Sequence, residues 1–261
     1  MPIDLHEKFS EFSYGYGVTR EVEHLLGARS LRVTPFLPSL VHEASLGFDV
    51  AFNKPGNPIL IQFKLGEQLS RFRPTNSVPN APHPLGRPYW RYKIDTSEDQ
   101  FINLRDWEQR GCDAYYASPR FATWFLFDSY FRSNAVLRSS LLIRPTDIAS
   151  AVATQTGSLG AHRILYDRHH CHVCSDPTPI DEVSVDDFLS KTEVRVRGDA
   201  RTLGERLKVI VRREEASELT RGRQRAADIR RRAKSEADAD AAILALEAWT
   251  KGAQVLFVTE T

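Results

Sequence analysis

Polar side chains within two apolar runs at residues 48–65 have the types that metal-assisted phosphate chemistry requires. Asp49 lies in the first run, and Gln62 and Lys64 lie two residues apart in the second. Because alternate residues of a strand point to the same face, we expect Gln62 and Lys64 to share one face. An acid, an amide and an ammonium in otherwise apolar strands are costly unless they are paired or hydrated. A functional role would account for that cost.

These residue types suggest a site for a divalent metal ion and a phosphodiester. A carboxylate and an amide oxygen are hard ligands of the kind that Mg²⁺ or Mn²⁺ takes. Lys64 would then position or deprotonate the attacking water, or neutralise charge that develops on phosphorus. The structural alternative is a buried ion pair between Asp49 and Lys64 on neighbouring strands.

The pattern resembles the signature of the PD-(D/E)xK, or restriction-endonuclease-like, nuclease superfamily, in the Gln variant of Mrr-like enzymes. In that signature an Asp at the end of one strand precedes (D/E/Q)-x-K on the next, which Asp49 and Gln62-Phe63-Lys64 match, within residues 10–130. The resemblance implies a metal-dependent endonuclease with Mg²⁺ or Mn²⁺ as cofactor and DNA as the expected substrate. It also implies a context of restriction, repair or anti-phage defence, with a partner protein of a defence system. A catalytically silent nucleic-acid-binding or assembly subunit of the same fold is the alternative, because Gln62 replaces an acid.

A further acid is expected at the site, because in this superfamily the helix before the catalytic strands often supplies one. Glu21 lies in the first turn of a helix predicted over residues 19–26, with Thr19 as its N-cap, and Glu23 is the second choice. Glu43, six residues before Asp49, is another candidate catalytic and metal-binding residue. The choice stays open, since an acid in a first helical turn also complements the helix dipole.

The predicted elements follow the order of the nuclease core. A turn at residues 14–17 precedes the first helix, and residues 48–52 and 59–65 form a hairpin around Pro55 and Gly56. A helix through residue 109 and a buried strand at residues 114–117 complete an α-β-β-α-β order. A core helix at 121–131, strands at 141–143, 162–166 and 172–175, and a helix at 146–153 follow. We therefore predict an α/β fold with a mixed central sheet flanked by helices.

Cations and aromatic residues alternate after Lys64 in a pattern that suits a nucleic-acid surface. Residues 66–88 are predicted to be a long proline-containing loop, which is usually functional or disordered. Arg and Lys contact phosphates, and rings stack on unpaired bases. The same alternation also describes a strand with one face in the core. The candidate nucleic-acid-binding residues here are Arg71, Arg73, Arg87, Trp90, Arg91 and Lys93.

Histidines and cysteines gather around a predicted turn at residues 167–168. Cys171 and Cys174 have the C-x2-C spacing of a zinc site, but four ligands are normally needed. Whether zinc is bound stays open for His169, His170, Cys171, His172 and Cys174.

The character of the chain changes after residue 188. Residues 191–236 contain 15 Lys and Arg against 8 Asp and Glu, so this stretch carries +7 while the whole chain carries +1. Residues 200–219 and 223–250 are predicted to be helical, with an alanine-rich stripe that packs on the body or on a second copy. Arg230, Arg231 and Arg232 are expected to stay outside the stripe and to bind nucleic acid. We predict a nuclease-like core at 1–188 and a basic helical extension at 189–261 that ends in a strand at 255–258.

Composition places the chain among globular proteins of a reducing compartment. Hydrophobic residues make up 41% of the sequence, which supports a sizeable core, and there are three cysteines. No run of about 18 apolar residues is present, so we expect a cytoplasmic protein without a membrane span.

Overall fold

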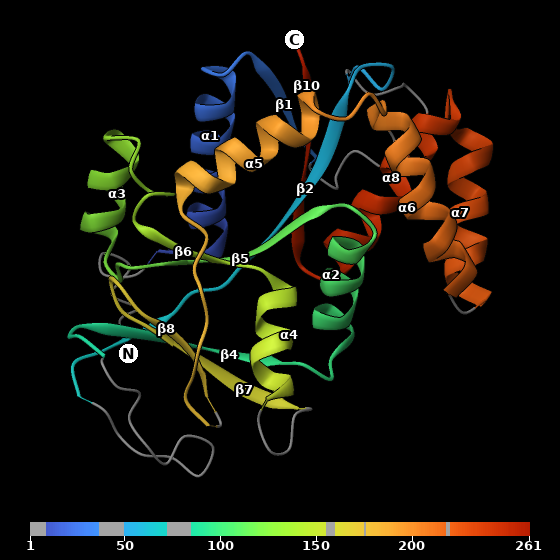
Figure 1. Ribbon diagram of the computed structural model, residues 1–261. Helices are drawn as coiled ribbons and strands as arrows, with labels where there is room; N and C mark the ends of the chain where they lie inside the picture. Colours follow the sequence, from blue (N-terminus) through green and yellow to red (C-terminus); the bar gives the residue numbers. More distant parts are fainter. Residues whose placement is uncertain (1–8, 37–49, 72–84, 155–159, 175, 218–219) are drawn as a thin grey trace, which may run out of the picture. The chain divides into compact units, whose positions relative to one another are not determined.

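The computed structural model describes residues 9–36, 50–71, 85–154, 160–174, 176–217 and 220–261, which contain both helices and strands (Figure 1). The helices are α1 (Glu11–Gly27), α2 (Asp99–Gln109), α3 (Trp124–Arg132), α4 (Pro145–Ala153), α5 (Val185–Arg197), α6 (Leu203–Ser217), α7 (Thr220–Arg232) and α8 (Glu236–Thr250). The strands are β1 (Leu31–Phe36), β2 (Gly56–Phe63), β3 (Glu67–Leu69), β4 (Tyr89–Asp95), β5 (Asp113–Pro119), β6 (Ser140–Ile143), β7 (Ala161–Tyr166), β8 (Cys171–Cys174), β9 (Thr178–Pro179) and β10 (Ala253–Glu260). None of the described helices is long and apolar enough to cross a membrane.

The strands form two sheets, which makes the protein an α/β protein as predicted. One mixed sheet has the order β1-β10-β2-β5-β6, and the other has the order β3-β4-β7-β8-β9. All eight residues of β2 and all seven of β5 are buried. Continuous burial explains why Ile59, Leu60 and Ile61 in β2 follow one another without the polar alternation of a half-exposed strand.

The chain divides into two compact units, whose boundary falls inside several elements. The first unit takes the described parts of residues 1–22, 62–105 and 115–188, and the second takes those of 23–61, 106–114 and 189–261. One boundary between the units falls after residue 188. Residues 189–261, however, share their unit with two earlier segments of the chain.

In the first unit, neighbouring strands of the sheet β3-β4-β7-β8-β9 are all antiparallel. The hairpin β7–β8 was predicted and is confirmed, with Tyr166 opposite Cys171. Glu67–Leu69 was predicted to be loop, but it forms strand β3 on the edge of this sheet. Three residues with two exposed side chains carry too little pattern to identify a strand from sequence.

In the second unit, the C-terminal strand β10 pairs with β1 in antiparallel register, with Val33 opposite Val258. Helices α6 and α8 pack on each other and on β10, and α7 packs on α8. The predicted helical stretch 223–250 is interrupted after Arg232, where Ser235 caps α8 by accepting a hydrogen bond from the Asp238 N–H. Ala241, Leu244 and Ala248 of the predicted stripe are buried, so the stripe packs within this unit.

The predicted turn at residues 14–17 is wrong, because these residues belong to α1. A Cβ at Gly15 would lie 2.8 Å from the Phe63 ring, and one at Gly17 would lie 3.1 Å from Phe127. The two glycines therefore allow α1 to approach its neighbours closely. The glycines suggested a turn because glycine is common in turns, but here they are needed for close helix packing.

The predicted hairpin is also wrong where its first arm is described. Residues 50–52 are not a strand; a turn here is closed by the Lys54 N–H, which donates to the Ala51 carbonyl at 3.1 Å. Gly56 begins β2, and a Cβ there would lie 2.5 Å from the Val258 carbonyl oxygen. β2 accordingly lies between β10 and β5. A strand from the far end of the chain replaces the expected local partner.

Candidate active site around Lys64

The backbone of Lys64 is fixed at the end of β2 by hydrogen bonds to β5. Its N–H donates to the Ala117 carbonyl at 3.0 Å, and its carbonyl accepts from the Ser118 hydroxyl at 2.7 Å. Ser118 is itself buried and lies 2.6 Å from the Tyr166 hydroxyl. These contacts, all within the first unit, fix the position of the Lys64 backbone and therefore of its Cβ.

The side chain of Lys64 is half-buried and held by an amide. Its Nζ donates to the Gln100 Oε1 at 2.9 Å, and Gln100 lies in the first turn of α2. Burial lowers the pKa of the Lys64 ammonium, while the negative charges of Glu11 and Glu98 act in the opposite direction. Gln100 therefore lies directly beside the Lys64 ammonium. A partly desolvated ammonium interacts strongly with an anion because water screens it less.

Gln62, two residues before Lys64, leaves one polar atom unpaired. Its side chain is buried, and its Nε2 donates to the Phe63 carbonyl at 3.3 Å. Its Oε1 has no hydrogen-bond partner among the described residues. Buried acceptors are nearly always satisfied in native proteins, so this oxygen calls for a donor or a cation.

Glu11 is a residue of this site that the sequence reasoning missed. It lies in the first turn of α1, where desolvation raises the pKa of its carboxyl and the Lys64 charge lowers it. The prediction started the helix at Thr19, eight residues too late. The signal was present in Ser10, whose hydroxyl accepts from the Ser13 N–H at 3.0 Å as a helix N-cap does.

Glu21, in contrast, has a structural environment. It is buried in the middle of α1, and its carboxylate accepts from the Leu137 N–H at 2.9 Å. Burial raises the pKa of the Glu21 carboxyl, and hydrogen bonds from the backbone of Val136, Leu137 and Arg138 oppose this. Glu21 is therefore not in a first helical turn, and its carboxylate stabilises the backbone of the segment before β6. Glu23 lies on the same helix and is exposed.

Three of the predicted residues, Asp49, Glu43 and Arg73, lie outside the described residues. Within the described residues, no three His, Cys, Asp or Glu side chains are grouped closely enough to hold a metal ion.

The alternation at residues 89–93 is that of a strand with one face in the core. Trp90, predicted to bind nucleic acid, is 3% exposed, and its ring stacks on Tyr166 at 6.0 Å. It is therefore not available to stack on a base, and this prediction is corrected. Arg91 pairs with Glu67 at 2.7 Å, and Lys93 is exposed. Arg71 and Arg87 are also exposed.

The three arginines at the end of α7 differ in their environments. Arg230 pairs with the buried carboxylate of Asp240 at 2.9 Å, and Arg231 pairs with Asp228 three residues earlier. Arg232 is exposed. As predicted, Arg231 and Arg232 lie outside the buried stripe. Arg230, in contrast, forms an ion pair with α8.

The histidine and cysteine cluster is largely built into the β7–β8 hairpin. Cys171 and Cys174 are buried free thiols, and burial raises the pKa of both, that of Cys174 to about 12. The Asp167 carboxylate accepts from the backbone N–H groups of His169 and His170, both at 2.7 Å. These hydrogen bonds to Asp167 stabilise the turn between β7 and β8.

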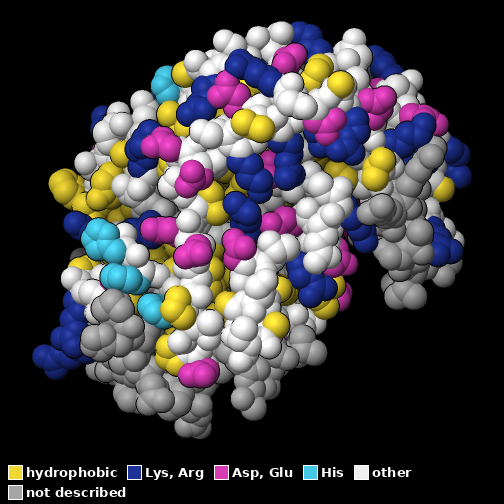
Figure 2. All heavy atoms as spheres, viewed as in Figure 1, with side chains coloured by type: hydrophobic (Ala, Val, Ile, Leu, Met, Phe, Trp, Pro, Cys, Tyr) yellow, Lys and Arg dark blue, Asp and Glu magenta, His cyan; other side chains and the backbone are white. Residues whose placement is uncertain are grey.

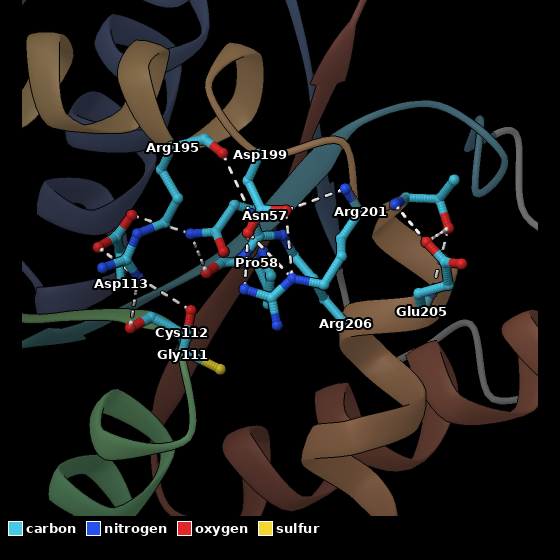
Figure 3. A network of polar contacts seen from close by, with 11 residues as sticks. Asn57, Pro58, Gly111, Cys112, Asp113, Arg195, Asp199, Arg201, Glu205 and Arg206 are labelled. Carbon is cyan, nitrogen blue, oxygen red and sulfur yellow. Dashed lines mark hydrogen bonds and ion pairs between the residues drawn. The ribbon is translucent and has the colours of Figure 1, made fainter.

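A polar network in the second unit surrounds the buried Asp113 (Figure 3). Asn57 donates to the Asp113 carboxylate at 2.8 Å, and Lys191 and Arg195 each lie 3.2 Å from it. Arg195 also donates to the Gly111 carbonyl at 2.9 Å, just after the end of α2. The network thus connects β2, β5 and α5 and neutralises a carboxylate that has no access to water.

Beyond Asp113 the network continues through Arg206 and Asp199. Arg206 lies 2.9 Å from Asp199 and donates to the Arg195 carbonyl at 3.1 Å (Figure 3). Arg201 pairs with the same carboxylate at 2.6 Å. Sequence reasoning did not identify this network, because its members are far apart in the chain.

Comparison with protein-family models, with curated proteins and with solved structures finds no match.

Proposed function

We propose that the protein is a divalent-metal-dependent nuclease that hydrolyses phosphodiester bonds, with DNA as its substrate. One observation carries the proposal. A partly desolvated Lys64 ammonium, held by Gln100, follows two residues after a buried Gln62 whose Oε1 has no partner among the described residues. Such a pair is costly in a core and suits a site where an anion and a cation bind.

Part of the element order supports a restriction-endonuclease-like core. Helix α1 precedes the buried strand β2, and α2 and the buried strand β5 follow. Glu11 on α1 and Gln100 on α2 both interact with Lys64, which comes directly after β2. Side chains from two helices therefore gather at the end of the strand that carries the Q-x-K residues.

The residues present fit a hard divalent cation in part. The unpaired Oε1 of Gln62 is the kind of oxygen that Mg²⁺ or Mn²⁺ takes, and Asp49, Glu43 and Glu11 are the acids that would complete the set. When bound, such an ion supplies Lewis-acid stabilisation of the charge on the phosphate.

Lys64 would donate a hydrogen bond to a phosphate oxygen and offset the negative charge that grows there in the transition state. Gln100 would orient the ammonium without neutralising it, because an amide oxygen carries no net charge. In the reaction, the oxygen of water forms a bond to phosphorus and the bond to the leaving oxygen breaks. The proton released by water is balanced by the proton that the leaving oxygen takes up.

A cleavage assay with Mg²⁺ or Mn²⁺ tests the proposal. The wild-type protein should cut DNA, and Lys64→Met and Asp49→Asn should each reduce cutting by at least about a hundredfold. Lys208→Met is the matched control, because this exposed lysine pairs with Glu236 at 3.3 Å in the second unit. Circular dichroism should show the same fold for all four proteins.

The contrary result would be a wild-type protein that binds nucleic acid but cuts none with either ion. The function would then be that of a catalytically silent nucleic-acid-binding or assembly subunit. The first explanation for the lost activity would be that Gln62 replaces an acidic metal ligand.

A further inference from the structure

Four large aromatic side chains on α1 and α3 are exposed, within the first unit. Phe12 is 81% exposed, Tyr16 59%, Trp124 43% and Phe125 78%. We call these four residues the aromatic surface. Figure 2 shows hydrophobic side chains gathered over the region of α3. Soluble proteins rarely expose several large rings together unless the surface binds a partner.

The two helices are fixed to each other beneath this surface by rings that are less exposed. Tyr16 stacks on Phe131 at 5.9 Å, and Trp124 contacts the buried Phe127 at 5.3 Å. Gly17 allows Phe127 to approach α1 closely. Tyr16 and Trp124 are therefore held in place by packed rings, which reduces the conformational entropy that they lose on binding.

A positive charge lies on the same face of α1 as Phe12 and Tyr16. Arg20 follows Phe12 and Tyr16 at four-residue intervals, which places the three side chains on one face of α1. Its guanidinium lies over the Phe131 ring at 4.3 Å and donates to the Phe131 carbonyl at 3.3 Å. Among the described residues, no carboxylate lies within ion-pair distance of it. The surface thus combines aromatic rings with an unneutralised positive charge.

Helix α1 also carries residues that contact the candidate active site. Phe12 is the neighbour of Glu11, whose carboxyl interacts with Lys64. Tyr14, on the same turn, packs edge-on against Phe63, one residue before Lys64, at 5.6 Å. The aromatic surface and Glu11 therefore share one helix.

We propose that this surface binds unpaired nucleotides of the substrate, with bases stacked on the rings and a phosphate on Arg20. The inference rests on the proposed nuclease function and adds that the substrate has a single-stranded segment. Rings stack on bases of any sequence, and arginine supplies the backbone contact. A second protein would match the rings equally well, but it would not account for the unneutralised charge of Arg20.

Binding of a fluorescent oligothymidine of about 16 nucleotides, measured in EDTA, separates this inference from catalysis. The wild-type protein should bind it more tightly than a hairpin duplex of equal length. Phe12→Ala and Phe125→Ala should each weaken binding about tenfold, and Phe125→Leu should weaken it as much, because leucine keeps bulk but cannot stack. Trp249→Ala is the control, since this exposed ring lies on α8 in the second unit.

Arg20→Gln should weaken binding and reduce the slope of log affinity against log salt by about 0.7, the value for one phosphate contact on a single strand. Unchanged affinity in the ring variants, or a preference for duplex, would overturn the inference even if the protein cuts DNA. A wild-type dimer in sedimentation that Phe125→Ala dissociates and Phe125→Leu retains would also overturn it in favour of a protein interface. Single-strand binding without cleavage would leave it standing while the nuclease proposal fails.

Discussion

At the scale of single residues, the Lys64 side chain lies where its charge costs stability. Burial lowers its pKa, so the charged form is less favourable in the folded protein than in the unfolded chain. That cost is complete below the folded pKa and disappears as the pH rises through the unfolded value. A lysine that is half-buried at this cost favours a binding role over a packing role.

Glu11 and Glu21 provide a residue-scale prediction, because they lie on one helix in different environments. Glu11→Gln should reduce DNA cleavage about tenfold with little change in stability, since it removes a charge that interacts with Lys64. Glu21→Ala should lower the free energy of unfolding by about 1–3 kcal/mol, because the buried Leu137 N–H loses its acceptor. Urea unfolding and cleavage assays on the same preparations measure both effects.

The opposite pattern would restore Glu21 as a metal ligand. Glu21→Ala would then abolish cleavage at unchanged stability, and Glu11→Gln would leave cleavage as it is.

At the scale of elements, the position of α1 depends on a glycine that packs against β2. Gly15→Ala should lower stability by about 1–3 kcal/mol, because the added Cβ would lie 2.8 Å from the Phe63 ring. Gly27→Ala, in the last turn of the same helix, has no atom within 4 Å of the added Cβ. Alanine is more favourable than glycine inside a helix, so Gly27→Ala should raise the free energy of unfolding by about 0.5–1 kcal/mol.

Thermal and urea unfolding of the two variants, side by side with the wild type, provide the comparison. If both substitutions stabilise the protein equally, the close approach of α1 to Phe63 does not exist in solution.

At the scale of the whole molecule, the positive charge of residues 191–236 is partly neutralised within the second unit. Lys191 and Arg195 compensate Asp113, and Arg230 compensates Asp240. The count of +7 therefore overstates the charge that a DNA backbone would meet. The alanine stripe of α8 is also covered by α6, α7 and β10, so any homo-oligomer formed through the C-terminal helices must use their other faces.

Exposed Arg232 is the arginine of this group best suited to bind a phosphate. Arg232→Gln should weaken duplex DNA binding and reduce the slope of log affinity against log salt by about 0.9, one phosphate contact. Arg230→Gln should mainly lower stability, because the buried Asp240 carboxylate loses a partner at 2.9 Å. Fluorescence anisotropy over a series of KCl concentrations and urea unfolding measure the two effects. An unchanged salt slope for Arg232→Gln would mean that α7 does not hold DNA.

Sequence by itself determined the elements whose pattern is local and strong. It identified β2 as a buried strand, α2 through its helical spacing, and the strands β5 to β8 and β10 through their apolar runs. It also selected Gln62 and Lys64, because polar residues in a buried strand are visible without a structure. Such features depend on neighbours within a few residues, which sequence periodicity records directly.

Tertiary structure alone decided which distant segments meet. β2 lies between β10 and β5 instead of pairing with a hairpin arm at residues 50–52. Glu11 interacts with Lys64, whereas Glu21 binds the backbone at Leu137. Strand pairing and carboxylate placement depend on non-local hydrogen bonds and on close packing at residues such as Gly15 and Gly56, which no local pattern encodes.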